Sequence, residues 1–167
     1  KKYPAGTELI VQVTKGPIGT KGPRVTTNVL LPGRYLVLLP NSEQSGVSRK
    51  IENKEERSRL KKIVRELNIP DGMGVIIRTA GENQRKAYFL RDLKILLDTW
   101  NDVTDRVQKQ SPGSCVFEEP DLIERTVRDF LTEDIERVVI DNISETDRVK
   151  DLIGRISKRS IEKVHRY

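Results

Sequence analysis

The 167-residue chain carries 31 Lys and Arg against 25 Asp and Glu, and 35% of its residues are hydrophobic, which is enough for one ordinary domain or two small ones. The sequence contains no run of 18 apolar residues, so it predicts no membrane span. The single cysteine, Cys115, excludes an internal disulfide and favours a reducing, cytoplasmic setting. His165 is the single histidine, so a His-rich metal site, a Ser-His-Asp triad and a Cys-His pair are all excluded unless residues outside this sequence supply them.

The net charge of +6 lies entirely in the first fifty residues. That segment holds eight Lys and Arg and two acids, whereas residues 51–167 hold 23 of each sign. A local excess of positive charge attracts polyanions such as nucleic acid. A basic surface that only aids solubility is the alternative interpretation.

The first forty residues predict β-strands. Short apolar or alternating runs occupy residues 9–13, 25–31 and 35–39. The loop 15–23 between the first two runs is rich in Gly and Pro and carries Lys15 and Lys21. Strands joined by basic, glycine-rich loops are typical of a small barrel that holds single-stranded RNA.

A helix and a strand follow the polar segment 41–50. Asn53 is the expected helix cap, with Glu56 three residues later. The apolar stripe of this helix comprises Leu60, Ile63, Val64 and Leu67. The strand over 74–78 finishes on Arg78 and Thr79, just before Gly81.

The second half of the chain predicts helix, strand and helix. A long helix over 84–109 carries a seam of apolar residues at alternating spacings of four and three, namely Phe89, Leu93, Leu96, Trp100, Val103 and Val107. Cys115 is expected to be a small buried residue. A helix opening at Pro120 should bury Ile123, Val127, Phe130 and Leu131, the strand 137–140 should follow, and Ser144 should cap the last helix. This order indicates part of an α/β layer.

Arg78 and Thr79 are the best candidates for chemistry. A guanidinium, a hydroxyl and the accessible backbone beside Gly81 suit a terminal phosphate, because arginine offers paired donors to phosphate oxygens. Arg49, followed by Lys50, could form a second basic wall, and Lys21 could contact backbone phosphates. The plain alternative for each is a solvated surface charge.

Catalytic metal binding finds little support. Asp129 and Asp134 are five residues apart and do not obviously face one another, and Asp141 with Asn142 indicates a strand-to-helix turn. A two-metal nuclease needs several carboxylates that converge within a few ångströms.

Several stretches together resemble the ribonuclease E/G family. The Arg-Thr-Ala-Gly strand end at 78–81 and the Tyr-Leu-Val-Leu strand at 35–38 are the most specific of them. Further matches lie at 19–22, 31–34, 46–51, 92–93, 128–131 and 140–142, so the resemblance covers essentially the whole chain.

The resemblance implies an α+β protein with three parts. Residues 1–30 would be the end of an OB-type RNA-binding β-barrel, residues 31–122 an α+β 5′-sensor domain, and residues 123–167 the start of a ribonuclease-H-like α/β layer. The barrel aromatics of the family would lie before Lys1, and its Mg²⁺-binding aspartates and zinc-linking cysteines after Tyr167.

The resemblance also implies roles for single residues. Arg78 and Thr79 match the residues that hold an RNA 5′-monophosphate, Val37 and Arg49 match contacts to the first nucleotides, and Lys21 matches a barrel lysine near the substrate path. The whole enzyme would be a Mg²⁺-dependent, homo-oligomeric endoribonuclease acting on single-stranded RNA in RNA processing and decay. No catalytic residue and no metal ligand are expected in this chain, which should not cleave RNA alone.

Two other functions fit the same residues. A non-enzymatic OB-fold module would bind single-stranded RNA through the first fifty residues without preferring a 5′ end. A scaffold domain would bind a protein partner through the seam 89–107 and would show no salt-dependent affinity for RNA.

Overall fold

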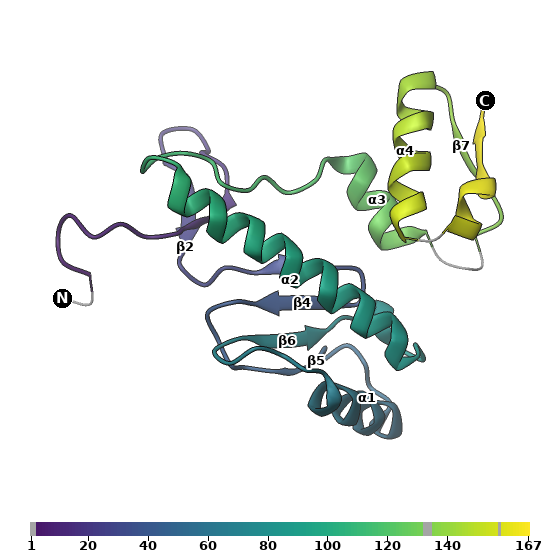
Figure 1. Ribbon diagram of the computed structural model, residues 1–167, viewed down its shortest axis with the longest axis horizontal. Helices are drawn as coiled ribbons and strands as arrows, with labels where there is room; N and C mark the ends of the chain where they lie inside the picture. Colours follow the sequence, from purple (N-terminus) through teal and green to yellow (C-terminus); the bar gives the residue numbers. More distant parts are fainter. Residues whose placement is uncertain (1–2, 132–134, 157) are drawn as a thin grey trace. The chain divides into compact units, whose positions relative to one another are not determined.

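The computed structural model describes residues 3–131, 135–156 and 158–167, which fall into two compact units, Lys1–Phe117 and Glu118–Tyr167 (Figure 1). Helices and small sheets occur in both units, so the predicted α+β class is confirmed. Within the described ranges no helix is long and apolar enough to cross a membrane. Asp134, one of the carboxylates considered for metal binding, lies outside the described residues.

The first unit begins with an antiparallel hairpin of β1 (Gln12–Lys15) and β2 (Arg24–Thr26). Both strands are shorter than the sequence predicts, and Val13 and Val25 are exposed. The Gln12 side chain ties the hairpin to the next segment, since its amide bonds both the N–H and the C=O of Leu30 at 2.9 and 3.0 Å. Across the described residues the strands form three separate open sheets and no barrel.

A four-stranded sheet forms the centre of the first unit. It contains β3 (Leu31–Pro32), β4 (Leu36–Leu39), β5 (Gly46–Val47) and β6 (Gly74–Ile77) in the spatial order β3-β4-β6-β5. Only the β5–β6 pair is parallel. Side chains alternate across the strands, so that Leu36, Leu38, Val75 and Ile77 are buried whereas Val37 and Ile76 are half-buried on the opposite face.

Two helices cover the buried face of this sheet. Helix α1 (Lys54–Glu66) packs on β5 and β6, and α2 (Lys86–Lys109) packs on β3 and β4 (Figure 1). As predicted, the Asn53 side chain caps α1 by accepting a 2.9 Å hydrogen bond from the backbone N–H of Glu56. The apolar stripe of α1 is buried, as predicted.

The seam of α2 is also buried, except for Val107 at its end. Phe89, Leu93, Leu96, Trp100 and Val103 all belong to the same core as the sheet. The seam therefore packs inside its own unit, which counts against the alternative of a scaffold that binds a partner through it. The expectation that Cys115 is buried is wrong. This residue lies exposed in the irregular segment after α2, with its thiol 3.4 Å from the carbonyl of Phe117.

The second unit is a small α/β layer. It contains α3 (Leu122–Phe130), β7 (Val138–Ile140), α4 (Ile143–Ile156), a 3₁₀ segment (Lys158–Lys163) and β8 (Val164–Arg166). Strand β8 pairs with β7 in parallel, a partner that the sequence did not reveal. The core of this unit comprises Val127, Leu131, Val149, Ile153 and Val164.

Two predictions for the second unit are wrong in detail. Phe130 is 70% exposed, because the nine-residue α3 buries only Val127 and its end cap Leu131. Asn142, not Ser144, caps α4: its side-chain oxygen accepts from the N–H of Glu145 and from the Ser144 hydroxyl. Asp141 and Asn142 do form the expected strand-to-helix turn.

Candidate functional site

Three loops of the first unit meet at one edge of the four-stranded sheet. Strand β4 starts at this edge, and β5 and β6 both end there. The N–H of Arg78 donates to the carbonyl of Tyr35 at 2.7 Å, and the N–H of Ser48 donates to the carbonyl of Ile77 at 2.8 Å. Residues 33–35, 48–51 and 78–84, which we call the loop edge, are therefore neighbours in space although they are far apart in sequence.

The buried carboxylate of Asp92 holds the first loop. Its Oδ1 accepts from the N–H of Arg34 at 3.1 Å, and its Oδ2 accepts from the N–H groups of Tyr35 and Leu36 at 2.8 Å each. Burial raises the pKa of Asp92 above its ordinary value, and the three N–H donors and the charge of Arg78 oppose that rise. Gly33 is required here, since a Cβ on it would lie 2.6 Å from Asp92 Oδ2.

The side chain of Arg78 is fixed in the same place. It is half-buried, its Nη1 donates to the carbonyl of Gly33, and its charge acts on the carboxylate of Asp92. Thr79 follows as the exposed first residue of a 3₁₀ turn (Thr79–Gly81). A guanidinium that packing and hydrogen bonds hold in one position loses less freedom when it binds an anion, which favours tight binding.

Helix α1 holds the other two loops. Arg57 Nη1 donates to the carbonyls of Ser48 and Ile51 at 2.5 and 2.9 Å, which closes the turn that carries Arg49. Glu56 accepts from the N–H of Asn83 at 2.8 Å and is paired with Arg59, whose guanidinium lowers the pKa of Glu56.

The same Arg59 reaches the third loop by donating to the carbonyl of Gln84 at 3.0 Å. Gly81 allows this loop to approach the core, because a Cβ there would lie 2.8 Å from both Ile77 and Phe89. The three loops thus have defined positions although two of them are irregular.

Replacing Arg57 with alanine is expected to lower the free energy of unfolding by about 1–2 kcal/mol, because two charge-assisted hydrogen bonds to backbone carbonyls are lost. Local opening at 48–51 should rise more than opening elsewhere. Hydrogen exchange at the amide of Ile51 measures this directly, and Lys62→Ala, an exposed position on the same helix, is the matched control. Unchanged exchange at Ile51 would show that Arg57 does not hold the turn.

The structure brings some of the predicted site residues together and separates others. Arg78, Thr79 and Arg49 all lie on the loop edge. Val37 lies on β4, opposite Ile76, on the half-buried face of the same sheet. Lys21 is exposed in a separate hairpin, where its backbone bonds Ile18 in a tight turn.

Sequence reasoning missed the residues that position the loops. Asp92 lies on the apolar seam between Phe89 and Leu96. A carboxylate on a buried helix face predicts a buried hydrogen-bond acceptor, so the sequence did contain a signal for this residue. No local pattern marked Arg57, because its partners at 48 and 51 depend on the packing of α1 against β5. Within the described ranges no three His, Cys, Asp or Glu side chains cluster as metal ligands would.

Comparison with known proteins identifies the family of this chain. The family model described as "Ribonuclease E/G family" matches residues 30–167, which include the loop edge, Asp92 and all of the second unit. The chain belongs to the ribonuclease E/G family. The expectation from the Arg-Thr-Ala-Gly and Tyr-Leu-Val-Leu stretches is therefore confirmed.

Relatives within the ribonuclease E/G family match most of the chain. It is 39% identical to "Ribonuclease E" of Haemophilus influenzae over 163 residues, which are 97% of this chain and 17% of the relative. It is 41% identical to "Ribonuclease G" of Escherichia coli (strain K12) over 137 residues, 82% of this chain and 28% of the relative. "Ribonuclease E" of Nostoc sp. is 36% identical over 146 residues, 87% of this chain. The chain thus spans less than a third of the length of these relatives.

Proposed function

We propose that the first unit binds the 5′ end of single-stranded RNA for an endoribonuclease of RNA processing and decay, and that the loop edge holds a 5′-monophosphate. The observation that carries the proposal is the placement of Arg78 and Thr79 on one loop and Arg49 on a neighbouring loop of the same edge, with both loops held by hydrogen bonds. Membership of the ribonuclease E/G family supports RNA as the ligand.

The chemistry of the loop edge suits a terminal monophosphate. Such a group carries a charge of about −1.5 to −2 and three acceptor oxygens at neutral pH. Arg78 supplies planar paired donors, Thr79 supplies an exposed hydroxyl at the start of its turn, and Arg49 supplies a second positive charge. A triphosphate carries more charge and more bulk than one guanidinium and one hydroxyl can accommodate. The site therefore favours processed RNA, which ends in a monophosphate, over new transcripts, which end in a triphosphate.

The nucleoside next to the phosphate would contact the sheet itself. Val37 and Ile76 form a small half-buried apolar surface at the centre of the sheet, and Val37 lies two residues from Tyr35, whose carbonyl bonds Arg78. An apolar surface accepts any base by its ring face and therefore adds affinity without sequence preference. Lys21 would contact the RNA backbone from the separate hairpin.

The other parts of the chain fit the same proposal. Residues 1–30 would complete an OB-type barrel, residues 31–122 would form the 5′ sensor, and residues 123–167 would begin a ribonuclease-H-like layer. The whole enzyme would be a cytoplasmic homo-oligomer whose Mg²⁺ activates water for phosphodiester hydrolysis. Within the described residues no three or more His, Cys, Asp or Glu side chains cluster as ligands for such an ion would, and the role that we propose for the first unit is binding.

RNA binding by fluorescence anisotropy tests the proposal. A short single-stranded RNA with a 5′-monophosphate is expected to bind at least about tenfold more tightly than the same RNA with a 5′-hydroxyl, because a charge-assisted pair is worth about 1.5–3 kcal/mol. Arg78→Ala should reduce the ratio of the two affinities to about one. Arg85→Ala removes an exposed arginine seven residues away and should leave the ratio unchanged.

Equal binding of both RNAs by the unaltered protein would contradict 5′ sensing. That result, together with equal competition from circular RNA, would favour the alternative, a single-stranded RNA-binding module with no end preference. The basic hairpin that carries Lys15, Lys21 and Arg24 would then be the principal contact.

A further inference from the structure

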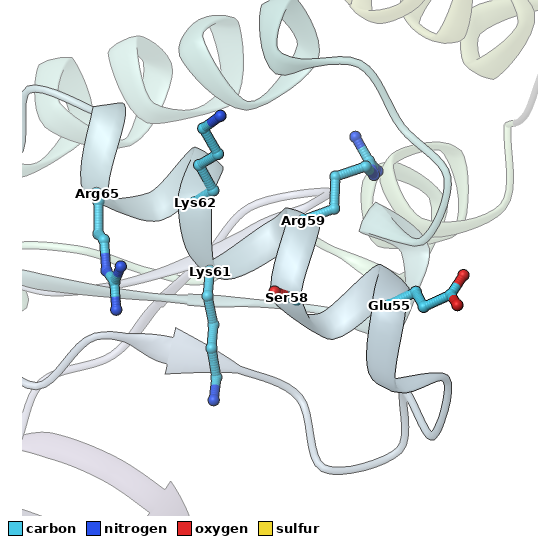
Figure 2. A pocket seen from close by; sticks show the side chains of 6 residues that line it. All are labelled: Glu55, Ser58, Arg59, Lys61, Lys62 and Arg65. Carbon is cyan, nitrogen blue, oxygen red and sulfur yellow. The ribbon is translucent and has the colours of Figure 1, made fainter.

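Helix α1 presents a stripe of positive charge to solvent. The side chains that face away from the buried Leu60, Ile63 and Val64 are exposed, and all of them except Lys54 line a shallow hollow of about 630 Å³ together with Glu55 and Arg59. We call this set the α1 stripe, and it comprises Lys54, Ser58, Lys61, Lys62 and Arg65. Figure 2 shows Lys61 and Arg65 pointing to one side of the helix and Lys62 to the other.

Two of the three acids of α1 have partners outside this stripe, and the third, Glu55, lies in the same hollow. Glu56 is paired with Arg59 at 2.7 Å, and Glu66 is paired with Lys86 of α2 at 2.8 Å. Within the part of the chain that the structure describes, no hydrogen bond or ion pair uses the amine of Lys61 or the guanidinium of Arg65. Lys61 and Arg65 thus lie together on one exposed side of the helix without an ion pair among the described residues, whereas Lys62 points to the other side.

The chemistry of the stripe indicates the kind of partner. Its residues are cationic or small and polar, and it contains no aromatic or large aliphatic side chain. Protein–protein interfaces rely on apolar and aromatic residues at their centre, whereas backbone binding to nucleic acid needs little besides Lys and Arg. A surface of this composition therefore fits a chain of phosphates better than it fits an acidic protein.

The stripe is also connected to the loop edge. The same helix holds the turn at 48–51 through Arg57 and the loop at 82–84 through Glu56 and Arg59. A helix of 13 residues is about 20 Å long, so RNA that leaves the loop edge can follow α1 within a few nucleotides.

We propose that the α1 stripe binds phosphates of the RNA body, as a second contact surface that is independent of the chemical group on the 5′ end. The inference rests on RNA being the ligand of this unit, but not on recognition of the monophosphate. Lys61 and Arg65 contribute most of the attraction. A long RNA reaches the stripe and gains affinity from it, whereas a very short RNA does not reach it.

The test compares RNAs of about 16 and about 4 nucleotides, the extremes of the usual site sizes, each with a 5′-monophosphate or a 5′-hydroxyl. Lys61→Ala with Arg65→Ala should weaken binding of the long RNA about 25-fold at about 0.1 M salt and reduce the salt-dependence slope by about 1.4, because each lost phosphate contact accounts for about 0.7. Lys94→Ala with Lys109→Ala removes two exposed charges from α2 and should have less effect.

The outcomes separate this inference from the proposed 5′ sensing. The α1 double variant should keep the monophosphate-to-hydroxyl affinity ratio, whereas Arg78→Ala should lose the ratio and keep the salt slope of the long 5′-hydroxyl RNA nearly unchanged. An unchanged slope in the α1 variant, or an equal loss in the α2 control, would overturn the inference. So would unchanged RNA binding with a lost affinity for polyglutamate, which would indicate an acidic protein as the partner.

Discussion

Replacing Asp92 with alanine is expected to lower the free energy of unfolding of the first unit by about 3 kcal/mol. The carboxylate accepts hydrogen bonds from three consecutive backbone N–H groups, at 34, 35 and 36, and it is buried. Alanine would leave those donors without a partner in a site that water enters poorly. The only tryptophan, Trp100, is buried in the same core, so its fluorescence during denaturant unfolding reports on this unit.

The same substitution should also disturb the loop edge. Asp92 fixes the turn at Gly33, and the carbonyl of Gly33 accepts from the guanidinium of Arg78. The preference for 5′-monophosphate RNA is therefore expected to fall toward one, even where the variant remains folded. Asp98→Ala, an exposed carboxylate on the same helix, is the control and should change neither stability nor preference. Similar values for the two variants would show that Asp92 does not hold the turn.

The pH dependence of stability provides a second test of Asp92. Burial raises its pKa in the folded state, so the folded protein binds the proton more tightly than the unfolded chain does. The stability of the unaltered protein relative to Asp92→Asn should thus decrease as pH rises from below the ordinary aspartate pKa through the raised folded pKa, and then remain constant. A relative stability that increases over that range would mean that the hydrogen bonds outweigh burial.

Phe89→Ala should cost about 3–5 kcal/mol of unfolding free energy, the largest effect of any change considered. Phe89 is fully buried and packs edge-on against the Tyr35 ring with centroids 6.0 Å apart, and its ring lies 2.8 Å from the position that a Cβ on Gly81 would take. Its removal leaves a cavity beneath two of the three loops. The denaturation midpoint followed by Trp100 fluorescence measures the loss.

Leu90→Ala is the matched control for Phe89, because Leu90 is the next residue on α2 and is 43% exposed. It should change the unfolding free energy by no more than about 0.5–1 kcal/mol. Comparable losses for the two substitutions would show that the buried Phe89 contributes no more to the core than the exposed Leu90.

Local patterns were sufficient to predict most of the elements of the fold. The Asn53 cap and the apolar stripe of α1 depend on residues within one or two helical turns of each other, and the seam of α2 has the same local origin. Such patterns determine which face of a helix is buried, so the predicted core residues from Leu60 to Val103 lie where the sequence placed them. The parallel partner of β7 was not predictable in this way, since β8 is 24 residues further along and only three residues long.

For this protein, the sequence by itself determined the family, the α+β class, the principal helices and the residue types that suit a phosphate. It did so because capping, periodicity and motif residues are local properties of the chain. Only the tertiary structure decided that Arg78, Thr79 and Arg49 share one edge, that Lys21 lies in a separate hairpin, and that Asp92, Arg57 and Glu56 hold the loops. Those relations depend on strand order and helix packing, which join residues up to 58 positions apart.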